Sequence, residues 1–254
     1  MLSLLAAAAL ATPSPIYHYI RSNRDGSEPE HVVHYRPTQT GIAVYKWLSK
    51  CTNAAYVTAE MSDDLRQGRV FIAGKVAKDG SQARFGILTL DPRLMTLAAD
   101  VTPPGGPRIQ VKHSLRAVPY LLYDFDFADL NSFLQEHRPK ADFAYALPVI
   151  WPSDEAIFRD LGMLRAHYAG EERHAGRDTL RFDLKVEGPT PSTGALWVDA
   201  DEGYIVEAEL GLPNHMEYKD FRLKLEKLEI GGQASWDALT KSQYANCPPA
   251  KPSP

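Results

Sequence analysis

Three aspartates, Asp124, Asp126 and Asp129, crowd a short stretch near the middle of the chain. Closely spaced carboxylates can hold a hard cation or raise one another's pKa for acid–base chemistry. Carboxylates at the start of a helix also accept free backbone N–H groups and complement the helix dipole. A calcium loop would need a glycine and a distal glutamate at fixed spacing, and both are missing here. We therefore interpret Asp126 and Asp129 as capping residues and predict no metal site.

His31 and His34 have the spacing of an H-x-x-H pair. In a strand, residues i and i+3 project to opposite faces, so one strand cannot direct both imidazoles to the same metal. Signatures of nucleotide-binding proteins, zinc proteases and serine hydrolases are absent, because the sequence contains no G-x-G-x-x-G, G-x-x-x-x-G-K-[ST], H-E-x-x-H or G-x-S-x-G motif. We expect no cofactor.

A denser cluster places His167 and His174 beside Glu171 and Glu172. Carboxylates next to an imidazole can transfer protons. Charged residues also line the edges of sheets, where they prevent pairing with neighbouring molecules, and we favour this interpretation. The alternative is a hydrolase whose site is assembled from Asp124, Asp126, His167 and Glu171.

Aromatic residues are the third feature, with 12 Tyr, 9 Phe and 4 Trp. On the concave face of a curved sheet such side chains would line a cavity for an apolar ligand. The simpler interpretation is that they fill the core. The candidate ligand-binding residues are Tyr45, Trp47, Tyr56, Phe71, Tyr123, Phe127, Leu130, Phe133 and Leu134.

The elements that must position these residues are mostly strands. The 17 glycines and 19 prolines divide the chain at short intervals, as expected where many short strands are turned. Lys78-Asp79-Gly80-Ser81 is the best hairpin signal. We predict strands over residues 16–22, 30–36, 42–48, 54–61, 69–77, 83–90, 109–115, 117–125, 143–150, 180–186, 196–199 and 204–210.

Helical spacing appears in three places. Leu130, Phe133, Leu134 and His137 recur at i, i+3, i+4 and i+7 after Asp126, which predicts a helix ended by Pro139. Short helices are also expected over residues 153–161 and 235–244. The apolar phase changes near residues 226–227 of another strand, which predicts a bulge there. The fold class is therefore mainly β, a strongly curved antiparallel sheet or half-open β-barrel with two or three short helices; a β-sandwich is the alternative.

The first eleven residues form an uncharged, small-apolar run that ends in Ala9-Leu10-Ala11. This pattern predicts a signal peptide over residues 1–11, followed by a single β-rich domain over 12–247. The proline-rich residues 248–254 are expected to be a disordered tail. No run approaches the roughly 20 apolar residues of a membrane span, so we expect a periplasmic or secreted protein without a transmembrane segment.

Cys51 and Cys247 are the chain's two cysteines. In an oxidising compartment, such a pair is most simply one disulfide. Neither cysteine has a C-x-x-C partner, which argues against zinc and redox chemistry.

Charge excludes another class of partner. The chain has 28 Lys and Arg against 32 Asp and Glu, a formal net charge of −4, and no lysine-rich run. Without a basic surface there is no footprint for a phosphate backbone, so we expect no nucleic acid.

The last third of the chain resembles a known group of proteins. Residues 170–172, 175–179, 196–199 and 203–206 read GEE, AGRDT, LWVD and GYIV. This pattern, within residues 162–221, resembles bacterial periplasmic lipoprotein-carrier-like proteins of the Lol type. The resemblance implies a half-open antiparallel barrel closed by a helical lid, which carries an acyl chain or another apolar molecule. It leaves residues 16–90 unexplained and maps no ligand contact onto this chain.

We therefore expect an exported, non-enzymatic protein that binds an apolar or lipid-like ligand, or an envelope partner, between a curved sheet and the helix of residues 127–137. The hydrolase above and a structural or interaction module are the alternatives. A continuous apolar cavity would favour the first expectation, and a polar cleft that gathers the acids and histidines would favour the second. A fully packed interior would favour the third.

Overall fold

Turn residues divide the first half of the chain into an antiparallel meander, in which each strand pairs with the next. The computed structural model describes residues 14–152 and 157–248. The predicted hairpin is confirmed, since the Ala77 N–H donates to the Ser81 carbonyl at 2.8 Å. The strands are β1 (Pro15–Ser22), β2 (Glu30–Tyr35), β3 (Gly41–Trp47), β4 (Ala55–Met61), β5 (Gly68–Val76), β6 (Gln82–Asp91), β7 (Thr96–Val101) and β8 (Ile109–Ser114).

The second half adds a further antiparallel series, which returns to the start of the chain because its last strand pairs with β1. Within that pairing the register shifts between His18 and Tyr19, whose partners are Lys227 and Leu225, so the predicted bulge is confirmed at Glu226. The strands are β9 (Phe143–Ile150), β10 (Phe158–His174), β11 (Arg177–Glu187), β12 (Ser192–Asp199), β13 (Ile205–Leu210) and β14 (Phe221–Ile230).

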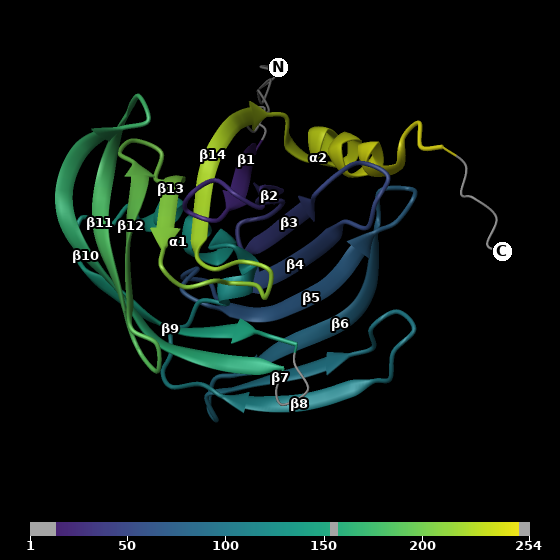
Figure 1. The fold of residues 1–254 in the computed structure, drawn as a ribbon, viewed down its shortest axis with the longest axis horizontal. Coiled ribbons are helices and arrows are strands. Elements are labelled where there is room, and N and C mark those ends of the chain that lie inside the picture. Colours follow the sequence, from purple (N-terminus) through teal and green to yellow (C-terminus); the bar gives the residue numbers. More distant parts are fainter. Residues whose placement is uncertain (1–13, 153–156, 249–254) are drawn as a thin grey trace, which may run out of the picture.

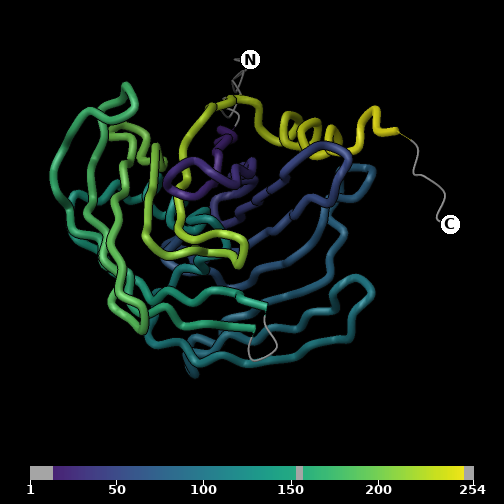
Figure 2. The backbone as a smooth tube through the Cα atoms, viewed as in Figure 1, coloured from purple at the N-terminus to yellow at the C-terminus, as the bar shows by residue number. Residues whose placement is uncertain are grey.

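The resulting sheet has fourteen strands in the described residues and curls until its two ends approach each other (Figure 1). His113 of β8 stacks on Phe158 of β10, with 5.1 Å between ring centroids. Beyond β8, the Leu121 N–H donates to the Ala146 carbonyl of β9 at 2.9 Å. The backbone trace follows this curl from β8 round to β9 (Figure 2). The mainly β, curved and barrel-like fold class is thus confirmed, and the sandwich is not found.

Helix α1 (Ala128–His137) lies inside the curl, whereas α2 (Gly232–Lys241) and the short η2 (Ser242–Tyr244) lie outside it (Figure 1). These helices agree with two of the three predicted helical segments. The third prediction is wrong for residues 158–161, which belong to β10 because they pair with β9. Residues 153–156 of that segment lie outside the described residues.

The strand expected over residues 117–125 is also wrong. This segment contains the cis Val118–Pro119 bond and the short helix η1 (Tyr123–Phe125). Pro119 has no N–H to give to a ladder, so an apolar run here does not become a regular strand. A single parallel bridge from Tyr120 to Ala146 joins it to β9.

Period-two alternation gives β3 two different apolar faces. Val44 points to the concave side, into the main cluster of buried side chains, which we call the inner cluster. Tyr45 and Trp47 point to the opposite side, into a second group that we call the outer cluster. Helix α2 covers this outer cluster through Trp236, whose indole N–H donates to the Tyr56 hydroxyl at 2.9 Å.

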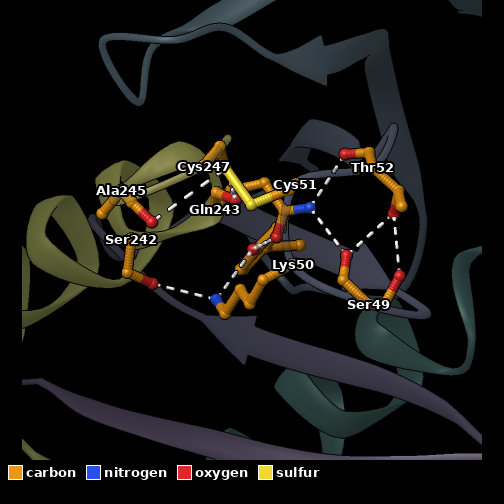
Figure 3. Close-up of a disulfide and its surroundings, with 9 residues drawn as sticks. Ser49, Lys50, Cys51, Thr52, Ser242, Gln243, Ala245 and Cys247 are labelled. Atoms are coloured by element: carbon orange, nitrogen blue, oxygen red, sulfur yellow. Dashed lines mark hydrogen bonds between the residues drawn. A yellow bond between two sulfur atoms is a disulfide. The ribbon is translucent and has the colours of Figure 1, made fainter. Parts of the chain in front are cut away.

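The predicted Cys51–Cys247 disulfide is confirmed and ties the end of the chain to the loop after β3 (Figure 3). Gln243 reinforces this attachment, because its side-chain amide donates to the carbonyls of Ser49 and Thr52 at 3.0 and 2.9 Å. A disulfide is typical of extracytoplasmic proteins. The signal peptide expected over residues 1–11 and residues 249–254 of the expected tail lie outside the described residues. In residues 14–152 and 157–248, no helix combines the length and apolar character needed to cross a bilayer.

Candidate functional site

A buried ion cluster occupies the concave side of β1 and β3, next to η1. Asp126 lies at its centre, with its carboxylate 2.5 Å from Lys46 Nζ and 3.2 Å from Arg21 Nη1. Asn214 donates a further hydrogen bond of 2.6 Å to the same carboxylate. Burial alone would raise the pKa of Asp126, but the two cations hold that pKa well below its ordinary value. Asp126 is therefore the charged partner of two buried cations.

The capping interpretation is consequently wrong for Asp126. The N-cap of α1 is Phe127, and no side chain caps it. Asp126 instead adopts a left-handed backbone conformation at the end of η1, which turns its carboxylate toward β1 and β3. Asp129 does bind a free N–H of the first helical turn, that of Leu130, at 2.9 Å.

Asp129 has a second role, because its other carboxylate oxygen accepts the Leu122 N–H at 2.9 Å. The side chain thereby joins α1 to the irregular segment before η1. Burial raises the pKa of Asp129 to about 7, although these backbone donors oppose the rise. With both oxygens engaged by backbone donors, this carboxyl group is structural.

The ion cluster continues toward solvent through Arg21, which is itself only 2% exposed. The Arg21 guanidinium contacts Glu30 and lies over the ring of Tyr218. Its Nη2 donates a hydrogen bond of 3.0 Å to the Tyr218 hydroxyl. Glu217, at 3.8 Å, is more exposed. Two buried cations are therefore matched by several acidic groups, as buried charges require.

A cavity of about 180 Å³ lies beside this cluster, between the concave face of β3–β7 and the segment that holds η1. Apolar side chains form most of its wall. The sheet contributes Ala55, Val57, Phe71, Ala73, Ile87, Leu88, Ala99 and Val101, and the opposite side contributes Leu122, Phe125, Ile150 and Ile157.

Three polar residues, Lys46, Asp124 and His215, line the same cavity. Lys46 Nζ donates to the Asp124 carbonyl at 2.6 Å, and Asp124 Oδ1 accepts the Ile150 N–H at 3.0 Å. Burial raises the pKa of Asp124 to about 6, although the Ile150 N–H and Lys46 oppose it. Burial, helped by the nearby cations, lowers the pKa of the His215 imidazole well below its ordinary value, so this ring is neutral. The cavity is thus amphipathic.

The structure divides the candidate ligand-binding residues among three places. Phe71 lines the cavity. Tyr123, Phe127, Leu130, Phe133 and Leu134 belong to the tightly buried inner cluster around η1 and α1. Tyr45, Trp47 and Tyr56 lie on the outer side under α2. This last placement differs from the concave face we expected, because the alternation of β3 directs its aromatic residues outward.

The expected position of the cavity also changes. Helix α1 does not form one wall of an open space, since its residues from Ala128 to Leu134 are all buried and its apolar residues belong to the inner cluster. Asn131 ties the helix to β13 by accepting the Ile205 N–H at 2.8 Å. The cavity lies instead on the η1 side of the same interior.

The acids and histidines of the hydrolase alternative do not share a site. His167 lies exposed beside Asp142, at 3.0 Å, and Glu171 pairs with Lys140 at 2.6 Å. Asp124 and Asp126 lie in the interior. Residues 167–174 of β10 pair only with β11, which agrees with the interpretation of a charged sheet edge. Within the described residues, no group of three or more potential ligands could hold a metal ion.

Sequence reasoning missed Lys46 and His215. A signal for Lys46 existed, because it has the same parity in β3 as the inward-facing Ile42 and Val44. His215 lies in the loop between β13 and β14, where no periodicity indicates its direction.

Comparison with known proteins gives a fold likeness alone. No family model and no curated protein matches the chain. The chain is similar to a β-barrel-like protein of a domain of unknown function, DUF1849, from Brucella abortus, with 8% identity and a TM-score of 0.44 over 87% of this chain and 98% of that chain. It is also similar to a DUF1329 family protein from Desulfovibrio piger, with 8% identity and a TM-score of 0.22 over 87% of each chain.

Proposed function

We propose that this protein binds an apolar or lipid-like ligand in the cavity between β3–β7 and η1. The observation that carries the proposal is the apolar wall of that cavity, which lies inside the curled sheet beside the buried side chains of the inner cluster. Ligand pockets are typically concave and apolar with a few polar groups, and this cavity has that composition.

The cavity volume limits the size of the group that enters. About 180 Å³ is slightly more than the ~150 Å³ of an engineered apolar cavity that binds benzene. It is less than the ~300–1,000 Å³ of pockets that enclose drug-sized molecules. The bound group is therefore a short alkyl chain, one aromatic ring, or one end of a longer acyl chain.

The resemblance to lipoprotein-carrier-like proteins supports an acyl chain as the ligand and transport through the periplasm as its purpose. In this proposal the curled sheet acts as the carrier and the cavity holds the part of the chain that is removed from water. Each buried methylene group contributes about 0.8 kcal/mol to such binding.

The test is native mass spectrometry of the mature protein purified from a bacterial periplasm, followed by organic extraction and lipid analysis. We expect one apolar molecule for each protein chain. Ala99→Leu places a larger side chain in the cavity wall and should abolish this co-purification, with a stability change of about 1–3 kcal/mol at most.

Ala98→Leu is the matched control, because Ala98 is the neighbouring residue of β7 and points to the opposite face of the sheet. It should retain the bound molecule. Equal occupancy in Ala99→Leu and the wild type would place the ligand elsewhere and overturn the proposal.

A further inference from the structure

The polar end of the cavity keeps hydrogen-bonding capacity that the protein does not use. His215 Nε2 is buried and has no hydrogen-bond partner among the described residues, although the backbone of Asp124 lies close to the imidazole. A buried polar nitrogen without a partner costs free energy of the order of 1–3 kcal/mol. Because His215 belongs to the wall of the cavity, a ligand atom that reaches this nitrogen would remove that cost. Water could fill this place in the free protein.

The two neighbouring groups extend this capacity. Lys46 Nζ has three N–H donors, and two acceptors, the Asp126 carboxylate and the Asp124 carbonyl, lie within 2.6 Å of it. Asp124 uses Oδ1 for the Ile150 N–H, while its side chain lines the cavity. One end of the cavity therefore offers a donor from Lys46, an acceptor from Asp124 and a neutral imidazole.

The surrounding charges restrict the head group that fits. An ammonium head would approach the cations Lys46 and Arg21, and a carboxylate head would approach Asp124 and Asp126. Glu30 and Glu217 add negative charge on the far side of Arg21. Because a further ion would meet a like charge at short range in a poorly solvated site, either charged head is disfavoured.

A hydroxyl group matches all three polar residues, since it donates one hydrogen bond and accepts others. We infer that the cavity, if it is the binding site proposed above, selects an uncharged amphipathic ligand, a molecule with an alkyl chain and a hydroxyl head. The chain lies against the apolar wall of β4–β7, and the hydroxyl lies among Lys46, Asp124 and His215.

The test compares four six-carbon probes, hexane, 1-hexanol, hexylammonium and hexanoate, by calorimetric titration of the full-length delipidated protein at pH 7.5. We expect 1-hexanol to bind one molecule per chain, at least tenfold more tightly than either charged probe. We expect it also to bind about fivefold more tightly than hexane, the effect of one net hydrogen bond.

The outcomes separate this inference from the proposed function. Binding of hexane and 1-hexanol with equal affinity would overturn the hydroxyl head while leaving apolar binding intact. If hexanoate or hexylammonium binds most tightly, the inference of a hydroxyl head is wrong and the cavity selects a charged head. Failure of all four probes would overturn the proposed function itself.

A variant tests whether the preference for 1-hexanol over hexane arises at the polar end of the cavity. Asp124→Asn keeps the side-chain shape and an oxygen for the Ile150 N–H, but its free end donates instead of accepting. We expect its affinity for 1-hexanol to fall about fivefold, toward that of hexane, while hexane binding stays unchanged. Asp142→Asn, at an exposed position, is the matched control. An unchanged preference for 1-hexanol in Asp124→Asn would overturn the assignment of the head group to this end.

Discussion

The two faces of β3 support opposite kinds of interior. On the outer side, Tyr45 stacks on Trp47, and Tyr35 stacks on Trp236 of α2. The Cys51–Cys247 bond ties the segment after α2 to the loop after β3. On the inner side, the same strand presents Lys46 to a buried carboxylate and to a cavity. Neighbouring residues of one strand thus lie in a closely packed aromatic cluster and in a polar, incompletely filled region.

The outer face of β3 has the features of a region that stabilises the fold, and the inner face has the features of a binding site. Close aromatic packing and a disulfide stabilise a fold and need no further explanation. Buried ion clusters are expensive to desolvate, and apolar residues of equal volume often serve stability better. A cavity likewise forgoes the contacts that a filled core would make. Departures from good packing are expected at functional sites, and in this molecule they occur together on the inner side.

The largest expected effect on the inner side of β3 comes from removal of the charge at the centre of the ion cluster. Asp126→Asn keeps the size of the side chain but leaves Lys46 and Arg21 without their shared anion. We expect a loss of about 3–5 kcal/mol in the free energy of unfolding, measured by urea titration. Asp142→Asn, which removes an exposed carboxylate, should have little effect. Equal losses in the two variants would show that the buried charge of Asp126 contributes no more to the free energy of unfolding than an exposed carboxylate does.

Removal of the disulfide tests the outer side. Cys51→Ser with Cys247→Ser releases a link between residues 196 positions apart and should lower the free energy of unfolding by about 2–5 kcal/mol. Because the cavity lies on the other face of the sheet, binding of 1-hexanol to the folded variant should be unchanged. A matching loss of affinity would show that the two sides are coupled and would contradict the separation drawn here.

The smallest expected effect concerns the pH dependence of stability. The pKa of Asp124 is raised by burial from its ordinary value of 3.8 to about 6 in the folded protein. The folded state therefore binds the proton more tightly, so this stabilisation is present below about pH 4 and is lost as the pH rises through about 6. Relative to Asp124→Asn, the wild type should lose about 1–3 kcal/mol between pH 4 and 7.

Paired urea titrations of the two proteins at several pH values measure this difference. Asp129, whose pKa is raised mainly by burial, is present in both proteins, so that part of its contribution cancels. The smaller part that the charge of Asp124 adds to the pKa of Asp129 belongs to the measured difference. A difference that stays constant from pH 4 to 7 would show that Asp124 is solvated like an ordinary surface carboxylate.

Much of the fold could be predicted because strands with one buried face carry a period of two. The alternation over residues 180–186 and the phase change near 226–227 both have direct counterparts in β11 and in the bulge of β14. The disulfide could be predicted because the chain has two cysteines and its N-terminal apolar run predicts export.

The site was less predictable because its residues depend on distant contacts. Asp126 has the spacing of a helix cap, yet two cations from β1 and β3 determine its role. The apolar run over residues 117–125 has strand composition, but Pro119 and the contact with β9 give it another path. Alternation along a strand requires Tyr45 and Lys46 to face opposite sides of β3, but the position of α2 decides which of these sides is the outer one.

The pairing of β1 with β14 also has a consequence for folding. Pro15 and Ile230, near opposite ends of the chain, are partners in the middle of the sheet. Strands β2 to β8 can form local hairpins as they emerge, but one side of β1 has no partner until β14 has been synthesised. Such non-local pairing slows folding and leaves strand edges open to aggregation in the meantime. We therefore expect the two halves of the sheet to form first and the β1–β14 pairing that joins them to form last.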